Sequence, residues 1–489
     1  MQLVALLLLL YVAGKIIYRL YFHPLRKFPG PKLAAISSLP EFYYNVVKGG
    51  MFIWEVERMH DKYGPIVRVN PDELHISDPD YCTEILAYCT EKIPFPNAKV
   101  AMANSTIATA DYNVHAARRR PLSPFFSKKA IQRLHPMISA KIEKLCQRMQ
   151  TAARDGTVLH MKKAFSALTV DIISEYTYGF SLNCLDQPDL RNEVHDAVAS
   201  LTNLTHILKF IPFVSVLASV PESLLSKISP AVGTIIALKQ SIRRKSQEVL
   251  ANPSEIRQDT HALFHALDKG PLSIGDEDEQ ERLVEEGIVI LGAGMDTTSS
   301  TLNLILFHLL YQPRLMVTLR EELDLHAEAT TWPELEQLPY LKSVVSEGLR
   351  LYVTFSERMQ RRNPDEDMKY QDWIIPAGTQ ISQSLHFIHT NAEIFPNPDR
   401  FDPGRWIRAQ ERGERLENRL VAFSRGSRQC LGLHLAYAEL YLTIATIVRR
   451  FDLELFETRR EDIVHYREYT LGRPKKPSAG LRVKVNGLR

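Results

Sequence analysis

The chain has 489 residues, 45% of them apolar, which is enough for a large core and exceeds the usual size of one domain. Its formal net charge of +3 gives no reason to expect a nucleic-acid partner. Four of its five cysteines, Cys82, Cys89, Cys146 and Cys184, show no metal-like spacing, so we expect reduced thiols in a cytosolic body.

Residues 1–22 form an apolar segment in which Gln2, Lys15 and Arg19 are the only strongly polar side chains. About 20 helical residues at a rise of 1.5 Å cross the roughly 30 Å hydrocarbon core of a bilayer. A cleaved signal peptide is the rival interpretation, but it needs positive charge before the apolar run, and here the charge follows it. We therefore expect residues 1–22 to be a membrane anchor that leaves the body in the cytosol.

The segment after the anchor, residues 23–34, is rich in proline and predicts a stiff hinge, because proline fixes φ and ends a helix. From residue 35 to residue 489 the sequence shows no linker or repeat, and most of it has helical periodicity. The expected interruptions are a hairpin of 66–69 with 74–76, a loop at 94–112, an apolar loop at 210–216, and a hairpin of 373–375 with 379–382.

A basic stretch begins at His115 and includes Arg119. An imidazole can donate a hydrogen bond to a carboxylate, so these two residues are candidates for holding an acidic group. The alternative is a solvated basic helix face. The residues that we assign to such a face are Arg118, Arg120, Lys128 and Lys129.

Residues 283–311 predict a long apolar helix. Two glycines interrupt its middle, at a cost of about 1 kcal/mol each relative to alanine, and Asp296, Thr297 and Thr298 follow them. Such local contradictions point to a functional site. The hydroxyls can bond back to main-chain carbonyls and loosen the helix, which would leave a groove, and the alternative is a buried Asp–Thr cap.

The most specific pattern surrounds Cys430, which is flanked by glycines and preceded by Arg428. Gly426 and Gly432 lack a Cβ, so the backbone there can lie against a flat cofactor. Residues 431–441 predict a helix, whose N-terminus would favour the ionised sulfur that binds metal. The guanidinium of Arg428 suits a carboxylate, and the alternative interpretation is a buried, inert cysteine.

This loop resembles the haem-binding signature of the cytochrome P450 family, Phe-x-x-Gly-x-Arg-x-Cys-x-Gly, and fills every specified position from Phe423 to Gly432. The resemblance implies that haem b is the cofactor and that Cys430 is its axial iron ligand. It also implies that Arg428 contacts a haem propionate and that Phe423 lies near the sulfur. The family's fold, a large helical body with small β-sheets, is then expected as one haem domain over residues 35–489.

Two charged motifs of the family are also present. Its Trp-x-x-x-Arg motif holds a haem propionate, and here Arg119 fits the arginine while His115 stands in the place of tryptophan. Its Glu-x-x-Arg motif matches Glu347 and Arg350, which a helix would place on one face. The resemblance implies a buried ionic triad of these two residues with Arg400.

The middle of the long helix resembles the oxygen-activation motif of the family in every position. The resemblance implies that Ala293 and Gly294 lie at the haem. Asp296 and Thr297 would then relay protons to the oxygen that is activated there.

We therefore expect a haem-thiolate monooxygenase that inserts one oxygen atom from O2 into a lipophilic small molecule, by hydroxylation or epoxidation, because a thiolate ligand favours O–O cleavage. One alternative is a family member that rearranges or dehydrates its substrate, and another is a non-catalytic haem sensor or carrier. Neither needs the Asp296–Thr297 pair. The proline-rich hinge resembles filamentous-fungal enzymes of secondary metabolism, with terpenoid, polyketide or alkaloid substrates.

The sequence contains no dinucleotide- or flavin-binding fingerprint, so the electrons must come from another protein. With a membrane anchor, that partner resembles the NADPH-cytochrome P450 reductase of the endoplasmic reticulum membrane, with cytochrome b5 as a further candidate. We expect the reductase to dock on the face of the cysteine loop. The residues expected there are Arg118, Arg120, Lys128, Lys129 and Arg425.

Overall fold

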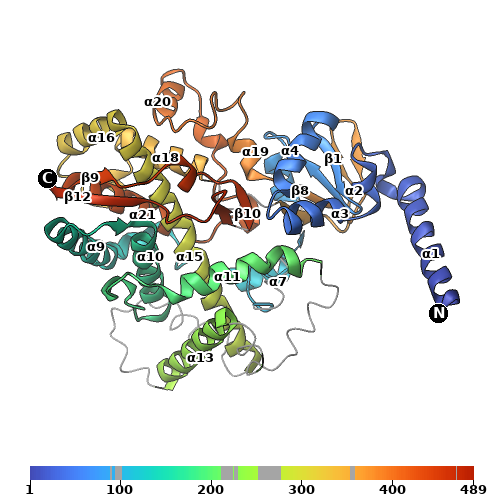
Figure 1. The fold of residues 1–489 in the computed structure, drawn as a ribbon, viewed down its shortest axis with the longest axis horizontal. Helices are drawn as coiled ribbons and strands as arrows, with labels where there is room; N and C mark the ends of the chain where they lie inside the picture. The colour runs from blue at the N-terminus through green and yellow to red at the C-terminus, as the bar shows by residue number, and fades with distance from the viewer. Residues whose placement is uncertain are drawn as a thin grey trace.

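The computed structural model describes residues 1–88, 91–93, 102–210, 224, 230–251, 277–352, 358–469 and 471–489. Cys89, the start of the predicted loop at 94–112 and nearly all of the loop at 210–216 lie outside the described residues. The body is mainly helical with small sheets, as the resemblance implies (Figure 1).

The helices and strands below are named as in Figure 1. The α-helices are α1 Gln2–Ile17, α2 Lys32–Ile36, α3 Leu39–Phe42, α4 Phe52–Tyr63, α5 Cys82–Tyr88, α7 Tyr112–Arg119, α8 Lys128–Arg133, α9 His135–Asp155, α10 Met161–Tyr178, α11 Glu193–Leu208, α13 Pro230–Ala251, α15 Glu277–Tyr311, α16 Pro313–Leu325, α17 Trp332–Leu335, α18 Pro339–Leu351, α19 Leu385–His389, α20 Gly404–Glu411 and α21 Leu433–Arg450. The strands are β1 Ile66–Asn70, β2 Glu73–Ile76, β3 Glu91–Lys92, β4 Leu159–His160, β5 Met359–Arg362, β6 Met368–Tyr370, β7 Trp373–Ile375, β8 Gln380–Gln383, β9 Phe451–Leu455, β10 Arg467–Tyr469, β11 Leu471–Arg473 and β12 Arg482–Leu488.

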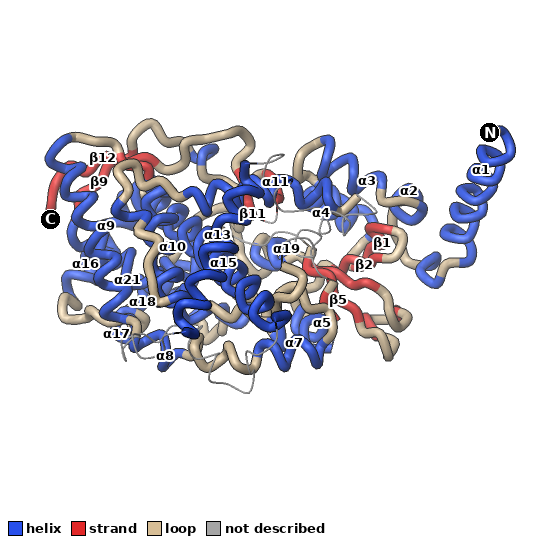
Figure 2. The backbone as a smooth tube through the Cα atoms, turned by 90° about the horizontal axis from the view of Figure 1, so that it is seen from below, coloured by secondary structure: helices blue, strands red, loops and turns tan. Residues whose placement is uncertain are grey.

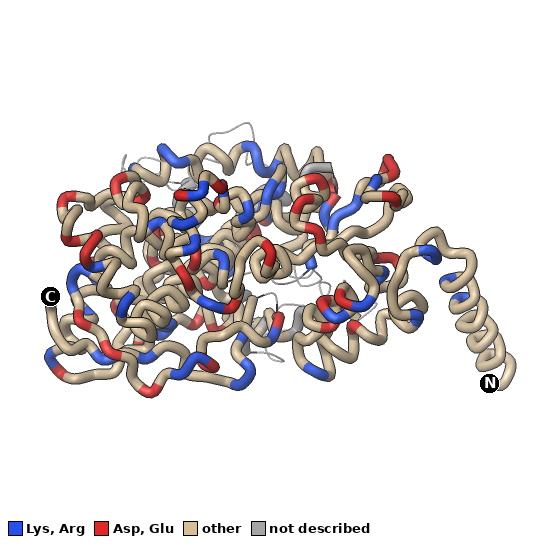
Figure 3. Tube along the Cα trace, turned by 90° about the horizontal axis from the view of Figure 1, so that it is seen from above, with Lys and Arg blue, Asp and Glu red and all other residues tan. Residues whose placement is uncertain are grey.

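The N-terminal helix projects from one end of the body and is almost free of charge (Figures 1 and 3). Together with the short turn that follows it, it gives an apolar segment of 21 residues with a mean hydropathy of 2.0, none of it buried in the body. The proline-rich segment after it packs onto the neighbouring sheet. Leu25 and Phe28 are buried there against Ile66 and Leu74, and the carbonyl of Pro29 accepts the N–H of Arg68 at 2.7 Å.

The strands around β1 and β2 lie at the end of the body near α1, whereas β9 and β12 lie at the other end near the C-terminus, and helices make up most of the rest (Figure 2). The largest sheet has five strands in the order β1-β2-β8-β5-β3, in which only β2 and β8 run parallel. The predicted hairpin of β1 with β2 is confirmed. The predicted hairpin of residues 373–375 with 379–382 is wrong, because β7 pairs back onto β6 and β8 crosses to β2 and β5.

The core lies where α15 runs through the body between α10, α18 and α21. The hydroxyl of Thr169 on α10 donates to the carbonyl of Met295 on α15 at 2.7 Å. A Cβ at Gly294 would lie 3.0 Å from Cγ1 of Ile173, and one at Gly348 only 2.3 Å from Cγ1 of Ile305. These glycines let α10 and α18 approach α15 closely. The missing side chain of Gly294 therefore has a packing reason in the structure, and its expected position at the haem stays a prediction.

Candidate active site

The loop that carries Cys430 is held by its own backbone. The N–H of Cys430 donates to the carbonyl of Phe423 at 2.9 Å. Between them Gly426 adopts φ 74°, a left-handed conformation that favours glycine. The following helix, α21, begins at Leu433 with Gly432 as its N-cap, slightly later than the sequence predicts. A Cβ at Gly432 would meet no atom within 4 Å, so this part of the loop faces open space.

Cys430 is an exposed residue, but the body of the protein lies close around its sulfur. These surroundings raise the pKa of Cys430, while the N–H of Gly432 and the charge of Arg119 oppose the shift. The ring of Phe423 lies 5.2 Å from that of Tyr437 on α21, which fixes the loop against the helix. Cys430 therefore lies on a loop that is held by its own backbone hydrogen bond and by the packing of Phe423.

Two of the predicted haem-binding side chains, His115 and Arg428, lie close together beside this loop. His115 on α7 is only 4% exposed, and its Nδ1 has no hydrogen-bond partner among the described residues. Burial, followed by the charges of Arg428 and Arg119, lowers the pKa of His115 to about 3. The guanidinium of Arg428 donates to the carbonyls of Thr109 and Ala110, both at 2.6 Å, and its buried Nε has no partner among the same residues.

This cluster fits the acidic edge of a haem. Lys92 and Arg361 also act on His115, so positive groups converge on one place. Asp111 and Glu91 act on Arg428, but within the described ranges no carboxylate forms an ion pair with Arg119 or Arg428, which are both half-buried. Partly buried donors of one sign are costly unless an anion satisfies them, and two propionates would do so. Cys430 would hold the iron, and Arg119, Arg428 and His115 would hold the propionates.

The middle of α15 combines buried and accessible residues in one helical turn. Ala293 is exposed and Thr297 is half-buried, whereas Asp296 and Thr298 are buried. The hydroxyl of Thr297 donates to the carbonyl of Ala293 at 2.8 Å, as the sequence predicts, and the helix stays continuous. An accessible alanine and threonine inside the longest helix mark an open side of α15.

Asp296 is held by a residue that the sequence did not point to. Its Oδ1 lies 3.4 Å from Nε2 of His195 on α11 and 3.4 Å from the hydroxyl of Ser300. Burial alone would raise the pKa of Asp296, but the hydrogen bond from His195 and the charge of Lys162 hold it down to about 2. The carboxylate is therefore ionised at neutral pH.

The described part of the predicted loop at 94–112 is pinned to the start of α15. The N–H of Asn104 donates to Glu285 and the N–H of Thr106 donates to Glu286, both at 2.7 Å. This end of the loop therefore lies along α15 and also supplies the two carbonyls that hold Arg428.

The buried carboxylate of Glu347 organises a charged network, but its third member is not Arg400. Glu347 and Arg350 are both fully buried and lie 2.8 Å apart. The second cation on Glu347 is Arg405 at 3.0 Å, and Trp406 Nε1 donates to it as well. The side chain of Arg400 is exposed, and only its carbonyl takes part, as an acceptor from Arg350 and Arg405.

The error has a visible cause in the sequence. The pattern of proline, any residue, arginine and aromatic occurs twice, at 398–401 and at 403–406. The second copy starts α20, which carries Arg405 into the interior. The first copy precedes this helix, and its arginine, Arg400, is exposed. The repeat was therefore a signal that could have identified Arg405.

Replacing Arg405 by methionine should destabilise the fold far more than the same change at Arg400. Loss of one partner from a buried ion pair costs about 3 to 5 kcal/mol, because the other charge stays buried alone. Thermal unfolding of the two variants beside the unchanged protein measures the difference. Equal losses at both positions would contradict the network described above.

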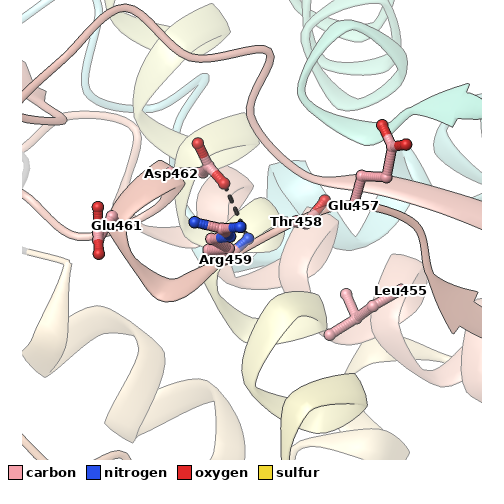
Figure 4. Close-up of a pocket in the computed structure, with 6 residues that line it drawn as sticks. All are labelled: Leu455, Glu457, Thr458, Arg459, Glu461 and Asp462. Atoms are coloured by element: carbon pink, nitrogen blue, oxygen red, sulfur yellow. Dashed lines mark hydrogen bonds between the residues drawn. The ribbon is translucent and has the colours of Figure 1, made fainter.

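A pocket of about 620 Å³ opens elsewhere, between the end of β9 and the turn that follows (Figure 4). None of the predicted site residues lines it. Its lining is mainly charged, and Asp462 accepts the N–H of Arg459 across it at 2.8 Å. The pocket is therefore separate from the cysteine loop and α15. The lining residues are Leu455, Glu457, Thr458, Arg459, Glu461 and Asp462.

Comparisons with known proteins agree with this geometry. The cytochrome P450 family model matches residues 35–479. The chain is 46% identical to conidiogenone synthase PchP450 of Penicillium rubens, over 98% of both chains. It is 38% identical to the cytochrome P450 monooxygenase pbrB of Penicillium brasilianum, over 98% of this chain and 96% of the relative. It is 39% identical to the cytochrome P450 monooxygenase aflU of Aspergillus parasiticus, over 98% and 97%.

Proposed function

Because the chain belongs to the cytochrome P450 family and is a monooxygenase similar to fungal relatives, we propose that it hydroxylates or epoxidises a lipophilic intermediate of secondary metabolism. A terpenoid, polyketide or alkaloid is the proposed substrate class. One relative is named as the synthase of a single compound, conidiogenone, which supports a role in making one defined metabolite.

The observation that carries the proposal is the turn of α15 that holds Asp296 and Thr297. The hydroxyl of Thr297 lies on the open side of the helix, bonded to the carbonyl of Ala293. The carboxylate of Asp296, next to it in sequence, is buried and ionised. An acid beside an accessible alcohol can move protons to an oxygen atom bound nearby. A rearranging or dehydrating enzyme does not need this pair.

The other predicted site residues would bind and orient the haem and the substrate. Haem, when bound, supplies the oxygen-activating chemistry, and a thiolate ligand favours O–O cleavage. Cys430 would bind its iron, while Arg119, Arg428 and His115 would hold its propionates. The loop along α15 has a mostly small, weakly polar middle in sequence, which suits a compact lipophilic substrate. Its end is tied to α15 by Asn104 and Thr106.

The proposed function is tested with the full chain, a diflavin reductase, NADPH and isotopically labelled dioxygen. Type I difference spectra against terpenoid, polyketide and alkaloid intermediates select the substrate. We expect one labelled oxygen atom in the product. Product formed without label would instead support rearrangement or dehydration, and haem binding without NADPH consumption would support a sensor or carrier.

We also propose that α1 anchors the chain in the endoplasmic reticulum membrane, with the body cytosolic and residues 23–34 as its hinge. The apolar segment is 21 residues long, and Lys15 and Arg19 lie toward its body end, where they can reach the interface. An NADPH-cytochrome P450 reductase in the same membrane would supply electrons. Cytochrome b5 is a second candidate donor.

Some of the cations that we expect at the reductase-docking face already have partners within the protein, and others do not. Arg120 and Lys129 are exposed and form no ion pair within the described ranges. Lys128 is already paired with Glu336 at 2.6 Å, and Arg118 donates to Thr109 at 2.6 Å. Arg425 donates to the carbonyl of Asn418.

Reversing the charge of Arg120 and Lys129 together should therefore slow electron transfer from the reductase at low salt and leave substrate binding unchanged. Exposed charges steer association, and the effect should fade as the ionic strength rises. Stopped-flow reduction measures it. The matched control reverses Lys62 and Lys369, two exposed cations on α4 and β6. Equal slowing in both double variants would count against this docking face.

A further inference from the structure

The imidazole of His195 lies between the buried Asp296 of α15 and the exposed Asp196. His195 lies near the start of α11, which packs on α15. Its Nε2 is 3.4 Å from Oδ1 of Asp296, and its Nδ1 is 3.3 Å from Oδ1 of Asp196. The main-chain N–H of His195 donates to Asn192 at 3.0 Å, which fixes this end of the helix. Each ring nitrogen thus faces a different carboxylate.

The exposed fraction of these three side chains decreases from the solvent toward the interior. Asp196 is 75% exposed, His195 is 20% exposed and Asp296 is 11% exposed. A proton can therefore reach the outer nitrogen of His195 from water, while the inner nitrogen faces the buried acid. This arrangement connects the bulk solvent with the turn of α15 that carries Thr297.

The charges around His195 and Asp296 determine which of the two side chains can carry a proton. His195 faces Asp296, Asp196 and Lys162 of α10. Burial lowers the pKa of His195, but the hydrogen bond to Asp296 and the charge of Asp296 outweigh this effect, so the pKa is raised. Asp296 also faces Ser300, and Arg473 of β11 contributes positive charge to it. With its pKa at about 2, Asp296 holds no proton of its own at neutral pH. The adjacent group whose pKa is raised, and which can exchange a proton with Asp296, is His195.

We propose that His195 positions Asp296 and supplies it with protons drawn from the solvent beside Asp196. In this step the Nε2–H bond of the imidazolium breaks, the proton binds Oδ1 of Asp296, and a solvent proton then restores the imidazolium. The inference rests on the proposed role of Asp296 and Thr297. It adds the source of the protons.

The first test measures the pair without turnover. Full-length His195→Gln, Asp296→Asn and the double variant are unfolded thermally at about pH 6 and about pH 9, on either side of the ordinary titration range of histidine. A histidine whose folded pKa is raised stabilises the fold fully below about pH 6.5 and loses this effect as pH rises through the raised value. We expect the two single losses to be non-additive at the lower pH and nearly additive at the higher one. Additive losses at both values would overturn the pairing.

The second test separates proton supply from positioning. Arginine at position 195 keeps a positive charge beside Asp296 but does not release a proton. We expect His195→Arg to recover the thermal stability that His195→Gln loses, while product formed per NADPH stays lower by roughly 100-fold or more in both variants. Full coupling in His195→Arg would overturn the proton supply.

The pH profile and a control complete the test. In the unchanged protein, coupling should fall as pH rises through the raised pKa of His195, and this alkaline limb should be absent in His195→Gln. Glu193→Gln removes an exposed acid of the same helix and should leave both readouts unchanged. If the unchanged protein incorporates labelled oxygen and the His195 variants remain fully coupled, only this inference fails. If it incorporates none, the proposed function fails with it.

Discussion

Replacing Cys430 by alanine should abolish activity and remove the long-wavelength Soret band that marks a thiolate ligand in the reduced carbonyl complex of this family. The reason is geometric, because Cys430 is exposed on its loop, whereas Cys82, Cys146 and Cys184 are buried. Burial raises the pKa of Cys82 and Cys184 to about 12 and that of Cys146 to about 11, so these thiols stay protonated. Absorbance of the reduced carbonyl complex and product formation measure the two effects.

A second variant at Cys430, one that keeps a side chain able to bind iron, separates loss of the thiolate from loss of haem. Cys430→His retains a donor for iron and should hold haem, yet it should lack the thiolate band and the O–O cleavage that a thiolate favours. Cys184→Ala is the matched control, because it removes a buried thiol and should keep both readouts. Retention of the thiolate band in both Cys430 variants would show that another sulfur binds the iron.

Much of this site could be predicted because its motifs are local. The residues between Phe423 and Gly432 interact within one loop, so their spacing alone describes the loop. Thr297 likewise bonds to Ala293 within one helical turn. In the same way Glu347 and Arg350 meet because they lie three positions apart on α18. Each of these contacts is determined by local secondary structure, which the periodicity of the sequence predicts well.

The errors and omissions concern contacts between distant segments. His195 and Asp296 are a hundred positions apart and meet only because α11 packs on α15. The partners of β8 depend on a crossover that no turn residue encodes. The assignment of Arg400 failed for a related reason, since only the direction of α20 decides which of two similar arginines turns inward.

Replacing Thr297 by alanine should leave haem binding and NADPH consumption intact while product formed per NADPH falls sharply. The change removes the hydroxyl on the open side of α15 and, with it, the proposed proton donor. A positioned donor of this kind is typically worth roughly 10²- to 10⁴-fold in the step that it serves. The reducing equivalents should then leave mainly as hydrogen peroxide. NADPH consumption, peroxide and product, measured in the same reaction, give the partition directly.

The structure supplies controls that distinguish loss of the hydroxyl from damage to the helix. Thr297→Ser keeps a hydroxyl that can still donate to the carbonyl of Ala293 and should remain coupled, whereas Thr297→Val keeps the shape and should not. Thr301, one turn further on, bonds back to the carbonyl of Thr297 at 3.0 Å, so Thr301→Val imposes a similar loss on the same helix and should leave coupling largely unchanged. Full coupling in Thr297→Ala and Thr297→Val would refute the relay. The rearranging or dehydrating reaction would then become the better account of this chain, because it needs no proton at that position.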